Sequence, residues 1–350
     1  MSHVDIRIDG AVGRITLNHP EALNALTHPM CLAIEAALDA WVGDDAVALV
    51  LIDAVGEKAF CAGGDIHQLY DAGRAGDSAE GASFWRDEYR LNRKLAEFPK
   101  PVVSLMQGFT MGGGVGIGCH GSHRVVCETS KIAMPEVSIG LVPDVGGSWI
   151  LANAPGRIGE YLGLTAARIG PADAILAGFA DTFVPQDAWP DLVKRLCEGV
   201  VSAVADAAQK PPEGRLATDG AWIDPAFAEA DPHAMLTALE TATSDGAAKA
   251  ATALRKNSPL ALACSVQMIR TLRDSGADMA EALATEFRFT SRAMEHGDFL
   301  EGIRAAIIDK DHAPNWRHSG LDAVSEAEVA AMLAPLGKNE LWHEPVAKAG

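Results

Sequence analysis

Strand-like and helix-like segments alternate along residues 4–127, and this alternation constrains the fold more than any other feature of the chain. Short apolar runs bounded by turn residues predict strands, whereas apolar residues three and four positions apart predict amphipathic helices. The predicted strands are residues 4–8, 12–17, 47–53, 101–106 and 123–127, and the predicted helices are residues 29–42, 85–98 and 112–119. The first two strands form a hairpin, because Asp9-Gly10 favours a two-residue turn. Strands that alternate with helices predict an α/β fold with a buried, mostly parallel sheet and a site in the loops at the strand ends.

Farther along the chain the strand pattern nearly disappears and helical spacing dominates. The predicted helices are residues 158–164, 171–177, 192–207, 234–243, 247–255 and 279–295. Another helix is expected to begin at Pro259, with Ser258 as its N-cap. Residues 209–232 contain four prolines and several glycines and acids, and we interpret them as a surface connection. We therefore divide the chain into an α/β core with the site, residues 1–200, and a mainly helical region, residues 201–350, that packs on the core or forms oligomer contacts.

Composition narrows the class of protein. With 350 residues and 48% hydrophobic content, the chain can fill the core of one large domain or two smaller ones. It has neither a charge-free apolar window of about 18 residues nor a secretory signal, so we expect a cytoplasmic protein that does not cross a membrane. The formal net charge of −18 argues against nucleic-acid binding. The six cysteines include no C-x-x-C pair, which predicts packed, reduced thiols.

Two acidic residues, Glu136 and Asp144, stand shortly after a glycine-rich run at residues 111–118, and a Gly-Gly pair lies within residues 59–66. Both glycine loops follow predicted strands. Backbone N–H groups from two strand ends that converge on one carbonyl oxygen stabilise an enolate or a tetrahedral oxyanion, and glycine permits the close approach. The carboxylates supply a base or a nucleophile. Each element alone is often only a turn, but their clustering predicts a site for acyl chemistry.

Two other interpretations fit the residues less well. Residues 116–121 match the dinucleotide-binding fingerprint, with Glu136 twenty positions after Gly116. A Rossmann site needs these glycines to open a helix directly after a strand, whereas here they run through the predicted helix. His120 and His123 have no acidic or cysteine partner at ligand spacing. We therefore expect no nucleotide cofactor and no metal ion.

Four motifs resemble those of the crotonase, or enoyl-CoA hydratase/isomerase, superfamily. They are Asn18-His-Pro with Asn24-Ala-Leu, Ala59-Phe-Cys-Ala-Gly-Gly-Asp65, Met111-Gly-Gly-Gly114 and Met134-Pro-Glu-Val-Ser-Ile-Gly140, in family order. Other segments are similar to the 3-hydroxyisobutyryl-CoA hydrolase subgroup: residues 85–92, His120-Gly121 with Arg124, residues 143–147 and residues 301–316. The resemblance covers nearly the whole chain. It implies a crotonase-like fold of repeated ββα units with a helical C-terminal region, and hydrolysis of a short β-hydroxyacyl-CoA thioester in valine breakdown.

The resemblance also implies roles for particular residues. The N–H groups of Ala62 and Gly113 would form the oxyanion hole, Glu136 would be the central carboxylate with Asp144 as its partner, and Glu88 would contact the substrate hydroxyl. The other residues assigned to substrate binding are glycines of the same loops: Gly63, Gly64 and Gly112. Glu136 could act as a nucleophile or as a general base. Two neighbouring acids are useful because burial and mutual repulsion raise one pKa, which leaves a proton for the departing thiolate.

Several alternatives stay open at this stage. Glu88 lies in a charged helical run that could face solvent, and Asp65 is expected to cap a helix beginning at Ile66. Hydratases of the superfamily usually have a second glutamate where this chain has Gly116, and a glycine where it has Asp144, so hydration or isomerisation of an enoyl-CoA is the alternative reaction. A non-catalytic acyl-CoA-binding subunit is the third interpretation. The expected partners are an acyl-CoA substrate and further copies of the chain in a homo-oligomer, which in the manner of the superfamily would be trimer-based. No cofactor is expected, since coenzyme A is part of the substrate.

Overall fold

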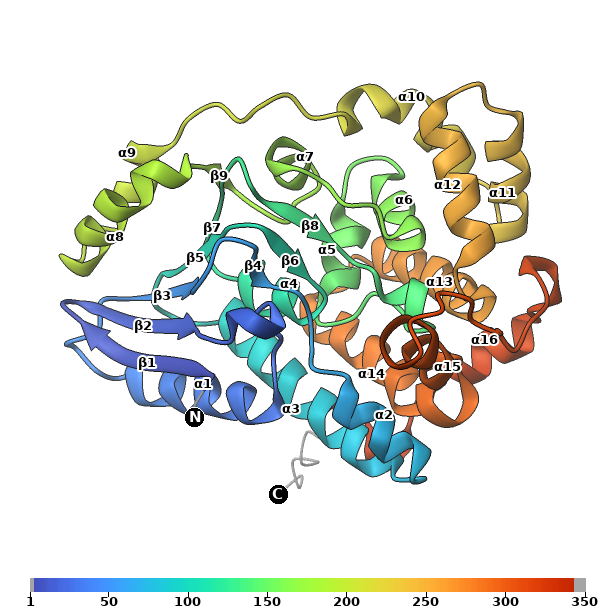
Figure 1. The fold of residues 1–350 in the computed structure, drawn as a ribbon, viewed down its shortest axis with the longest axis horizontal. Helices are drawn as coiled ribbons and strands as arrows, with labels where there is room; N and C mark the ends of the chain where they lie inside the picture. Colours follow the sequence, from blue (N-terminus) through green and yellow to red (C-terminus); the bar gives the residue numbers. More distant parts are fainter. Residues whose placement is uncertain (1–2, 343–350) are drawn as a thin grey trace, which may run out of the picture.

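The structure is a computed structural model that describes residues 3–342 (Figure 1). Residues 1–2 and the last eight residues of the predicted C-terminal region, 343–350, lie outside this range. The N-terminal half holds two sheets, and the C-terminal half is helical, as the sequence predicts.

The larger sheet has six strands in the order β1-β2-β3-β5-β7-β9. These are β1 (Val4–Asp9), β2 (Val12–Leu17), β3 (Leu49–Ala54), β5 (Val102–Met106), β7 (His123–Val126) and β9 (Thr182–Phe183). The hairpin β1–β2 is antiparallel, with Asp9 opposite Val12, and every other pair is parallel. The predicted hairpin and the mostly parallel sheet are therefore confirmed.

Both faces of the larger sheet are buried. Alternate side chains of a strand point to opposite faces, and in β3 Val50 and Ile52 join the main hydrophobic core while Leu49 and Leu51 pack toward helices α8 (Trp189–Cys197) and α9 (Ala203–Ala207). This two-sided burial explains why the parallel strands are continuous apolar runs in the sequence.

A second sheet of three short parallel strands was not predicted. Its strands are β4 (Ala59–Cys61), β6 (Phe109–Met111) and β8 (Lys131–Ala133), in that order. Each follows a strand of the larger sheet: β4 follows β3, β6 follows β5 and β8 follows β7. Since carboxyl ends of neighbouring parallel strands lie at one edge, the loops after these three strands are brought together. This repeated pairing of a long and a short strand confirms the expected crotonase-like succession of units.

Four helices accompany these strands: α1 (His28–Trp41), α2 (His67–Arg74), α3 (Ser78–Ala96) and α4 (Gly113–Gly118). The helix α3 begins seven residues before its predicted start, because the Asp77 side chain accepts a hydrogen bond from the Glu80 N–H and caps a turn without apolar periodicity. The Asp65 carboxylate accepts a hydrogen bond from the N–H of His67, the first residue of α2. Asp65 therefore caps this helix as expected, although the helix begins at His67 and not at Ile66.

The remaining helices build the C-terminal half. They are α5 (Gly147–Asn153), α6 (Ile158–Thr165), α7 (Pro171–Leu176), α10 (Leu216–Phe227), α11 (Pro232–Thr241), α12 (Asp245–Lys256), α13 (Pro259–Ser275), α14 (Met279–His296), α15 (Phe299–Ile303) and α16 (Glu326–Leu333). Short 3-10 turns lie at Pro20–Ala22, Glu136–Ile139, Gln186–Ala188, Leu321–Ala323 and Gly337–Asn339, and a π-helical turn covers Arg304–Ile308. The predicted cap of α13 is confirmed, since the Ser258 hydroxyl accepts a hydrogen bond from the Ala261 N–H.

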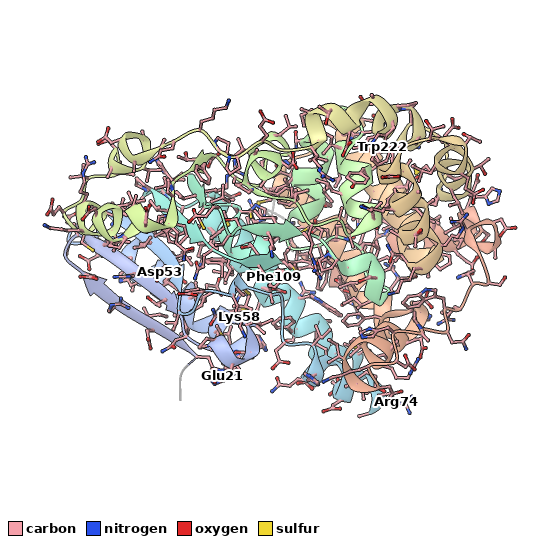
Figure 2. The ribbon with its side chains drawn as sticks, turned by 45° about the horizontal axis from the view of Figure 1, so that its top comes forward. Glu21, Asp53, Lys58, Arg74, Phe109 and Trp222 are labelled. Carbon is pink, nitrogen blue, oxygen red and sulfur yellow. The ribbon has the colours of Figure 1, made fainter. Side chains whose placement is uncertain are left out.

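Two sequence predictions in this half were wrong. Residues 192–207 form the two helices α8 and α9 rather than one, and Gly199 between them has a φ of +82°, a left-handed conformation that suits glycine. Residues 209–232 are not only a connection, because α10 forms there with Pro225 inside it. Its Trp222 ring lies 5.4 Å from the ring of Tyr161 in α6, so packing on the core outweighs the cost of the proline (Figure 2).

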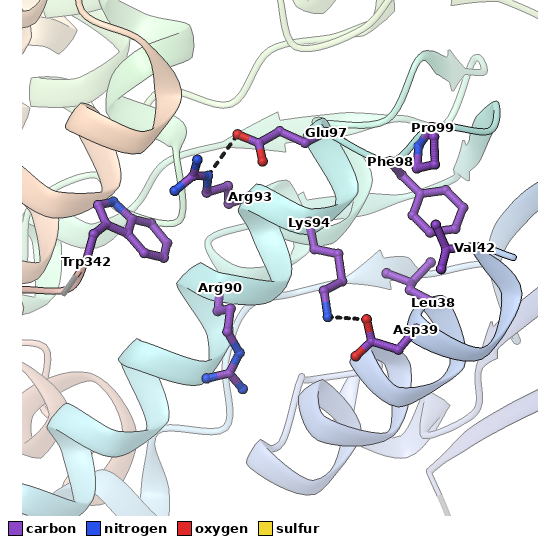
Figure 3. A pocket seen from close by; sticks show the side chains of 10 residues that line it. All are labelled: Leu38, Asp39, Val42, Arg90, Arg93, Lys94, Glu97, Phe98, Pro99 and Trp342. Atoms are coloured by element: carbon purple, nitrogen blue, oxygen red, sulfur yellow. Dashed lines mark hydrogen bonds and ion pairs between the residues drawn. The ribbon is translucent and has the colours of Figure 1, made fainter. Parts of the chain in front are cut away.

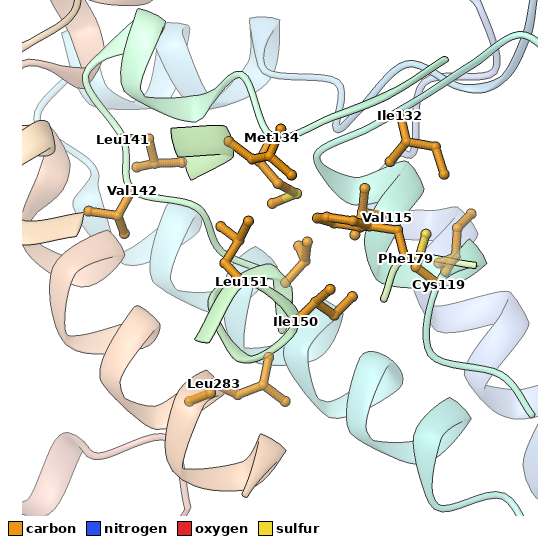
Figure 4. Close-up of a cluster of buried hydrophobic side chains, with 14 of the residues drawn as sticks. Val115, Cys119, Ile132, Met134, Leu141, Val142, Ile150, Leu151, Phe179 and Leu283 are labelled. Atoms are coloured by element: carbon orange, nitrogen blue, oxygen red, sulfur yellow. The ribbon is translucent and has the colours of Figure 1, made fainter. Parts of the chain in front are cut away.

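One hydrophobic core joins both halves, since a continuous cluster of buried side chains includes Val4 at one end and Leu341 at the other. Figure 4 shows part of it, where Val115 of α4, Ile150 of α5 and Leu283 of α14 lie in the same cluster. The helical region therefore packs on the α/β core. Within residues 3–342, none of the helices is long and apolar enough to cross a membrane.

Candidate active site

Three loops meet at the carboxyl edge of the small sheet and enclose a cavity of about 110 Å³. The loop after β4 contributes Ala62, Gly63 and Gly64, the loop after β6 contributes Gly112 and Gly113, and the loop after β8 contributes Pro135 and Glu136. The other walls come from α2, α3, α15 and the segment before α5, through Ile66, Leu69, Phe84, Trp85, Glu88, Ile139, Leu141, Asp144, Val145 and Phe299. All eight residues assigned to the site from the sequence therefore line one cavity.

Three carboxyl groups in this cavity are almost fully buried. Glu88 is 2% exposed, Asp144 4% and Glu136 5%. The alternative that Glu88 faces solvent with the rest of its charged helical run is therefore wrong. Within residues 3–342, Oε1 of Glu88 and Oε2 of Glu136 have no hydrogen-bond partner. Asp144 accepts a hydrogen bond of 2.7 Å from the phenol of Tyr89. Buried polar atoms without a partner are costly, and here they point to a ligand that supplies the missing bonds.

Burial controls the protonation of these groups. It raises the pKa of Glu136 well above its usual value, and the charge of Asp144 adds to the effect. Burial likewise raises the pKa of Asp144, although the Tyr89 hydrogen bond acts in the opposite direction. The pKa of Glu88 is raised by burial first and by Asp144 second. Because burial raises all three pKa values, and the charge of Asp144 raises those of Glu136 and Glu88 further, the cavity retains protons near neutral pH.

The glycines let the backbone come close to these acids. A methyl group at Gly112 would lie 2.9 Å from Oε1 of Glu136, and one at Gly113 would lie 2.8 Å from Oε1 of Glu88. Gly112 also has a φ of +49°, and Gly63 has a φ of +122°. Alanine at these positions would therefore crowd a carboxylate or strain the backbone.

The assignment of Ala62 as an oxyanion-hole donor was wrong. Its N–H donates a hydrogen bond of 3.1 Å to the carbonyl of Leu23 and is not free for a ligand. Within the described part of the chain, the N–H of Gly64 has no backbone acceptor, and its nitrogen lies 3.3 Å from the position of a Cβ on Gly113. Gly113 opens α4, so its own N–H has no acceptor within that helix. The two N–H groups that neighbour one another are therefore those of Gly64 and Gly113.

The roles of three residues around Asp144 were missed from the sequence. Tyr89 holds Asp144, while His120 and Glu286 bond the turn that follows it. Tyr89 directly follows the predicted Glu88, but consecutive helical side chains point about 100° apart, so its contact with Asp144 could not be read from that position. Glu286 stands 140 positions from its partner Gly146, and no local pattern reveals that contact.

The geometry of this region bears on the rival interpretations of the sequence. A side chain at Gly116 would meet Asn92 Nδ2 at 2.6 Å and Val145 Cβ at 2.9 Å, so a glutamate has no room there. The glycines 116–121 run through and past α4 rather than opening it. Burial lowers the pKa of His120 to about 4, and its ring bonds the Val145 carbonyl. No group of three metal-ligating side chains occurs in the range 3–342.

A second hollow lies on the surface between α1 and α3 and is lined by basic side chains (Figure 3). Each of these basic side chains forms an ion pair with an acidic residue of the protein. Arg90 pairs with Glu35, Lys94 with Asp39, and Arg93 with Glu97. Its cations are neutralised within the protein, so this hollow gives no reason to place an anionic ligand there.

Comparisons with known proteins agree on the family but differ on the reaction. A family model described as enoyl-CoA hydratase/isomerase matches residues 12–333. The 3-hydroxyisobutyryl-CoA hydrolases, named as mitochondrial, of Gallus gallus and Homo sapiens are 37% and 34% identical, each over 95% of this chain and 89% and 88% of their own length. A solved structure of an enoyl-CoA hydratase from Rhodobacter sphaeroides 2.4.1 is 56% identical with a TM-score of 0.95, and covers 98% of this chain and 100% of that one. The solved structure of a carnitinyl-CoA dehydratase from Mycobacterium thermoresistibile is 40% identical with a TM-score of 0.94, and covers 99% of this chain and 100% of that one.

The raised pKa values predict how stability depends on pH. For Glu136 the folded pKa lies above the usual 4.5. As pH rises above the pKa of Glu136 in the unfolded chain, the unfolded chain loses this proton while the folded protein keeps it. The free energy of unfolding of the wild type therefore falls by about 1.4 kcal/mol per pH unit until the pKa of the folded state is reached. Glu136→Gln removes this loss. We expect the variant to be more stable than the wild type at pH 7, with a smaller difference near pH 4, in urea unfolding followed by circular dichroism.

Glu35→Gln is the matched control, because hydrogen bonds from Arg90 hold the pKa of Glu35 below its usual value. This variant should be less stable than the wild type at pH 7, and the deficit should shrink as pH falls. If Glu136→Gln were also less stable than the wild type at pH 7, with a deficit that shrinks as pH falls, Glu136 would be ionised in the folded protein. The description of the cavity would then be wrong.

Proposed function

Because the chain belongs to the enoyl-CoA hydratase/isomerase family, we propose that its carboxylate cavity hydrolyses the thioester of a short β-hydroxyacyl-CoA, foremost 3-hydroxyisobutyryl-CoA, which yields 3-hydroxyisobutyrate and coenzyme A in valine breakdown. The observation that carries this proposal is Asp144, buried beside Glu136 in a cavity that leaves no space for a second glutamate at Gly116. The hydrolases of Gallus gallus and Homo sapiens support the same reaction.

The first step needs a polarised thioester carbonyl. We propose that the oxygen accepts hydrogen bonds from the N–H groups of Gly64 and Gly113, which are adjacent and face no backbone acceptor in the described chain. Preorganised donors in a site closed to bulk water stabilise the negative charge that develops on this oxygen. A donor pair and carboxylates are sufficient for a thioester, so we propose that no cofactor beyond the substrate's own coenzyme A takes part.

Glu136 then delivers the oxygen nucleophile. Either its carboxylate attacks the carbonyl carbon and water cleaves the resulting anhydride, or it takes a proton from a water molecule that attacks directly. In both routes the C–S bond breaks and the product acid keeps one new C–O bond beside its original carbonyl. A carboxylic acid of the site protonates the departing thiolate, and a proton from water restores that acid. The shared protonation of Glu136 and Asp144 provides a carboxylate and a carboxylic acid in one site.

Glu88 accounts for a substrate with a hydroxyl group. Its Oε1 is buried without a partner and lies at the Gly113 side of the cavity. A hydroxyl at the β-carbon supplies the missing hydrogen bond, whereas an acyl chain without it leaves the polar atom unsatisfied. The aromatic pair Trp85 and Phe299, with ring centroids 5.6 Å apart, adds an apolar wall that suits a short, branched acyl group.

Hydration of an enoyl-CoA is the second candidate, because the Rhodobacter sphaeroides structure is called a hydratase. This reaction requires two acid–base groups at the double bond. The position where family hydratases usually have their second glutamate is Gly116, packed against Asn92 and Val145. Hydrolysis remains the better fit to these residues. The homo-oligomer and the cytoplasmic location expected from the sequence remain predictions.

The proposal is tested by thiol release from 3-hydroxyisobutyryl-CoA and from isobutyryl-CoA, measured with a chromogenic thiol reagent, beside hydration of crotonyl-CoA. We expect kcat/KM for the hydroxylated thioester to exceed that for isobutyryl-CoA by about tenfold or more, because a buried polar atom left without its hydrogen bond costs about 1–3 kcal/mol. Hydration of crotonyl-CoA without thiol release from either thioester would instead establish the hydratase.

Gly113→Ala tests the proposed oxyanion hole. Its methyl group would meet Oε1 of Glu88 and displace one N–H donor, so we expect kcat to fall about 100-fold or more. Gly43→Ala is the control, since no atom lies within 4 Å of a Cβ at that position. Equal activity of the two variants, with both folded by circular dichroism, would remove Gly113 from the site.

A further inference from the structure

Glu286, on α14, is a buried acid for which the proposed chemistry has no use. Its exposed fraction is 0%. One carboxylate oxygen accepts a hydrogen bond of 2.9 Å from the Gly146 N–H, and the other accepts hydrogen bonds from both the N–H and the hydroxyl of Ser148. The donors belong to Gly146, in the turn that follows Asp144, and to Ser148, in the first turn of α5. A single side chain from the C-terminal half therefore holds the backbone beside a proposed catalytic residue.

That turn is strained. Val145 has a φ of +53°, a left-handed conformation that is rare for a β-branched residue. Such a conformation persists only where surrounding contacts enforce it. Here contacts hold the turn from two sides. The His120 ring nitrogen lies 2.8 Å from the Val145 carbonyl oxygen, and Glu286 accepts hydrogen bonds from the N–H groups of Gly146 and Ser148.

The strained turn determines where the Asp144 carboxylate points. Asp144 is directed to the Tyr89 phenol at 2.7 Å, and its neighbour Val145 lines the cavity itself. Relaxation of Val145 to a negative φ would rotate the peptide that joins it to Asp144. The three donors on Glu286 resist this rotation, since each would lose its acceptor.

We propose that Glu286 is a positioning residue for the reaction, which holds the strained turn at residues 144–148 so that Asp144 faces Tyr89 and Glu136. The proposal rests on the proposed hydrolysis and names a residue from α14 on which that chemistry depends. Glu286 acts through Asp144 and does not touch the substrate cavity.

Its charge acts on the same set of groups. Burial is the main reason that the pKa values of Glu136 and Glu88 are raised, and Glu286 adds to both shifts after Asp144. Burial raises the pKa of Glu286 itself to about 8, against the hydrogen bonds from Ser148 and Gly146. The titratable groups around Glu286 are Glu88 and Tyr89 on α3, Glu136 and Asp144, with His120 across the turn. At neutral pH Glu286 is therefore largely protonated, and its charge acts on Glu136 only at alkaline pH.

The test compares wild type, Glu286→Gln, Glu286→Asp and the control Glu281→Gln, an exposed residue on the same helix. Glutamine turns an NH₂ group toward one of the three donors, so the turn loses part of its support. For 3-hydroxyisobutyryl-CoA we expect kcat to fall at least tenfold with KM changed less than twofold. Because Glu286 is largely protonated in the acid range, the acid limb of the kcat profile should stay in place. Aspartate is one methylene shorter and should also lower kcat, while Glu281→Gln should match the wild type.

Three results would overturn the proposal: unchanged kcat in folded Glu286→Gln, a loss that only follows the unfolded fraction, or a KM that rises as much as kcat falls. Absence of thiol release by the wild type would contradict the proposed hydrolysis. The positioning role of Glu286 would then be tested by measurements of the free energy of unfolding. In that case the effects of Glu286→Gln and Asp144→Asn on the free energy of unfolding at pH 7 should be non-additive, since coupled groups do not contribute independently. Additive effects would refute the positioning role.

Discussion

The burial of four carboxyl groups, three lining one cavity and a fourth behind it, is the constraint on which the rest of the structure depends. Glu88, Glu136, Asp144 and Glu286 are each at most 5% exposed, and within residues 3–342 none of them forms an ion pair. Charged groups in such a place are costly, so they retain protons instead. This cost is acceptable in a catalytic site, because a mixture of carboxylate and carboxylic acid at neutral pH is what acyl transfer to water requires.

The fold supplies these acids from separate parts of the chain. Glu136 follows the third short strand of the small sheet, and Glu88 lies on α3 above that sheet's carboxyl edge. Asp144 lies in the turn before α5, and α14 brings Glu286 against this turn. The helical C-terminal half thus contributes to the site itself as well as to the hydrophobic core, which explains why the main cluster of buried side chains runs through both halves.

Much of this arrangement could be predicted from the sequence, and the failures have physical causes. Apolar periodicity located the longer strands and most helices, but β4, β6 and β8 have three residues each, too few to show a period of two. The motifs located Glu136, Asp144 and the glycines, but not the direction of an N–H group. Ala62 donates to Leu23, a pairing set by two distant loops, so the available donor is Gly64. Glu286 was missed because its partners are 138 and 140 positions away.

Infrared difference spectroscopy of the carboxyl groups tests the central claim most directly. The C=O stretch of a protonated carboxylic acid is separate from the bands of a carboxylate, so wild type at pH 7 can be compared with Glu136→Gln and Glu88→Gln. We predict a protonated-acid band in the folded wild type at pH 7 that is reduced in each variant and disappears on unfolding, since unfolding restores ordinary pKa values. A folded wild type at pH 7 with only carboxylate bands would contradict this account, because the buried acids would then hold no proton to share.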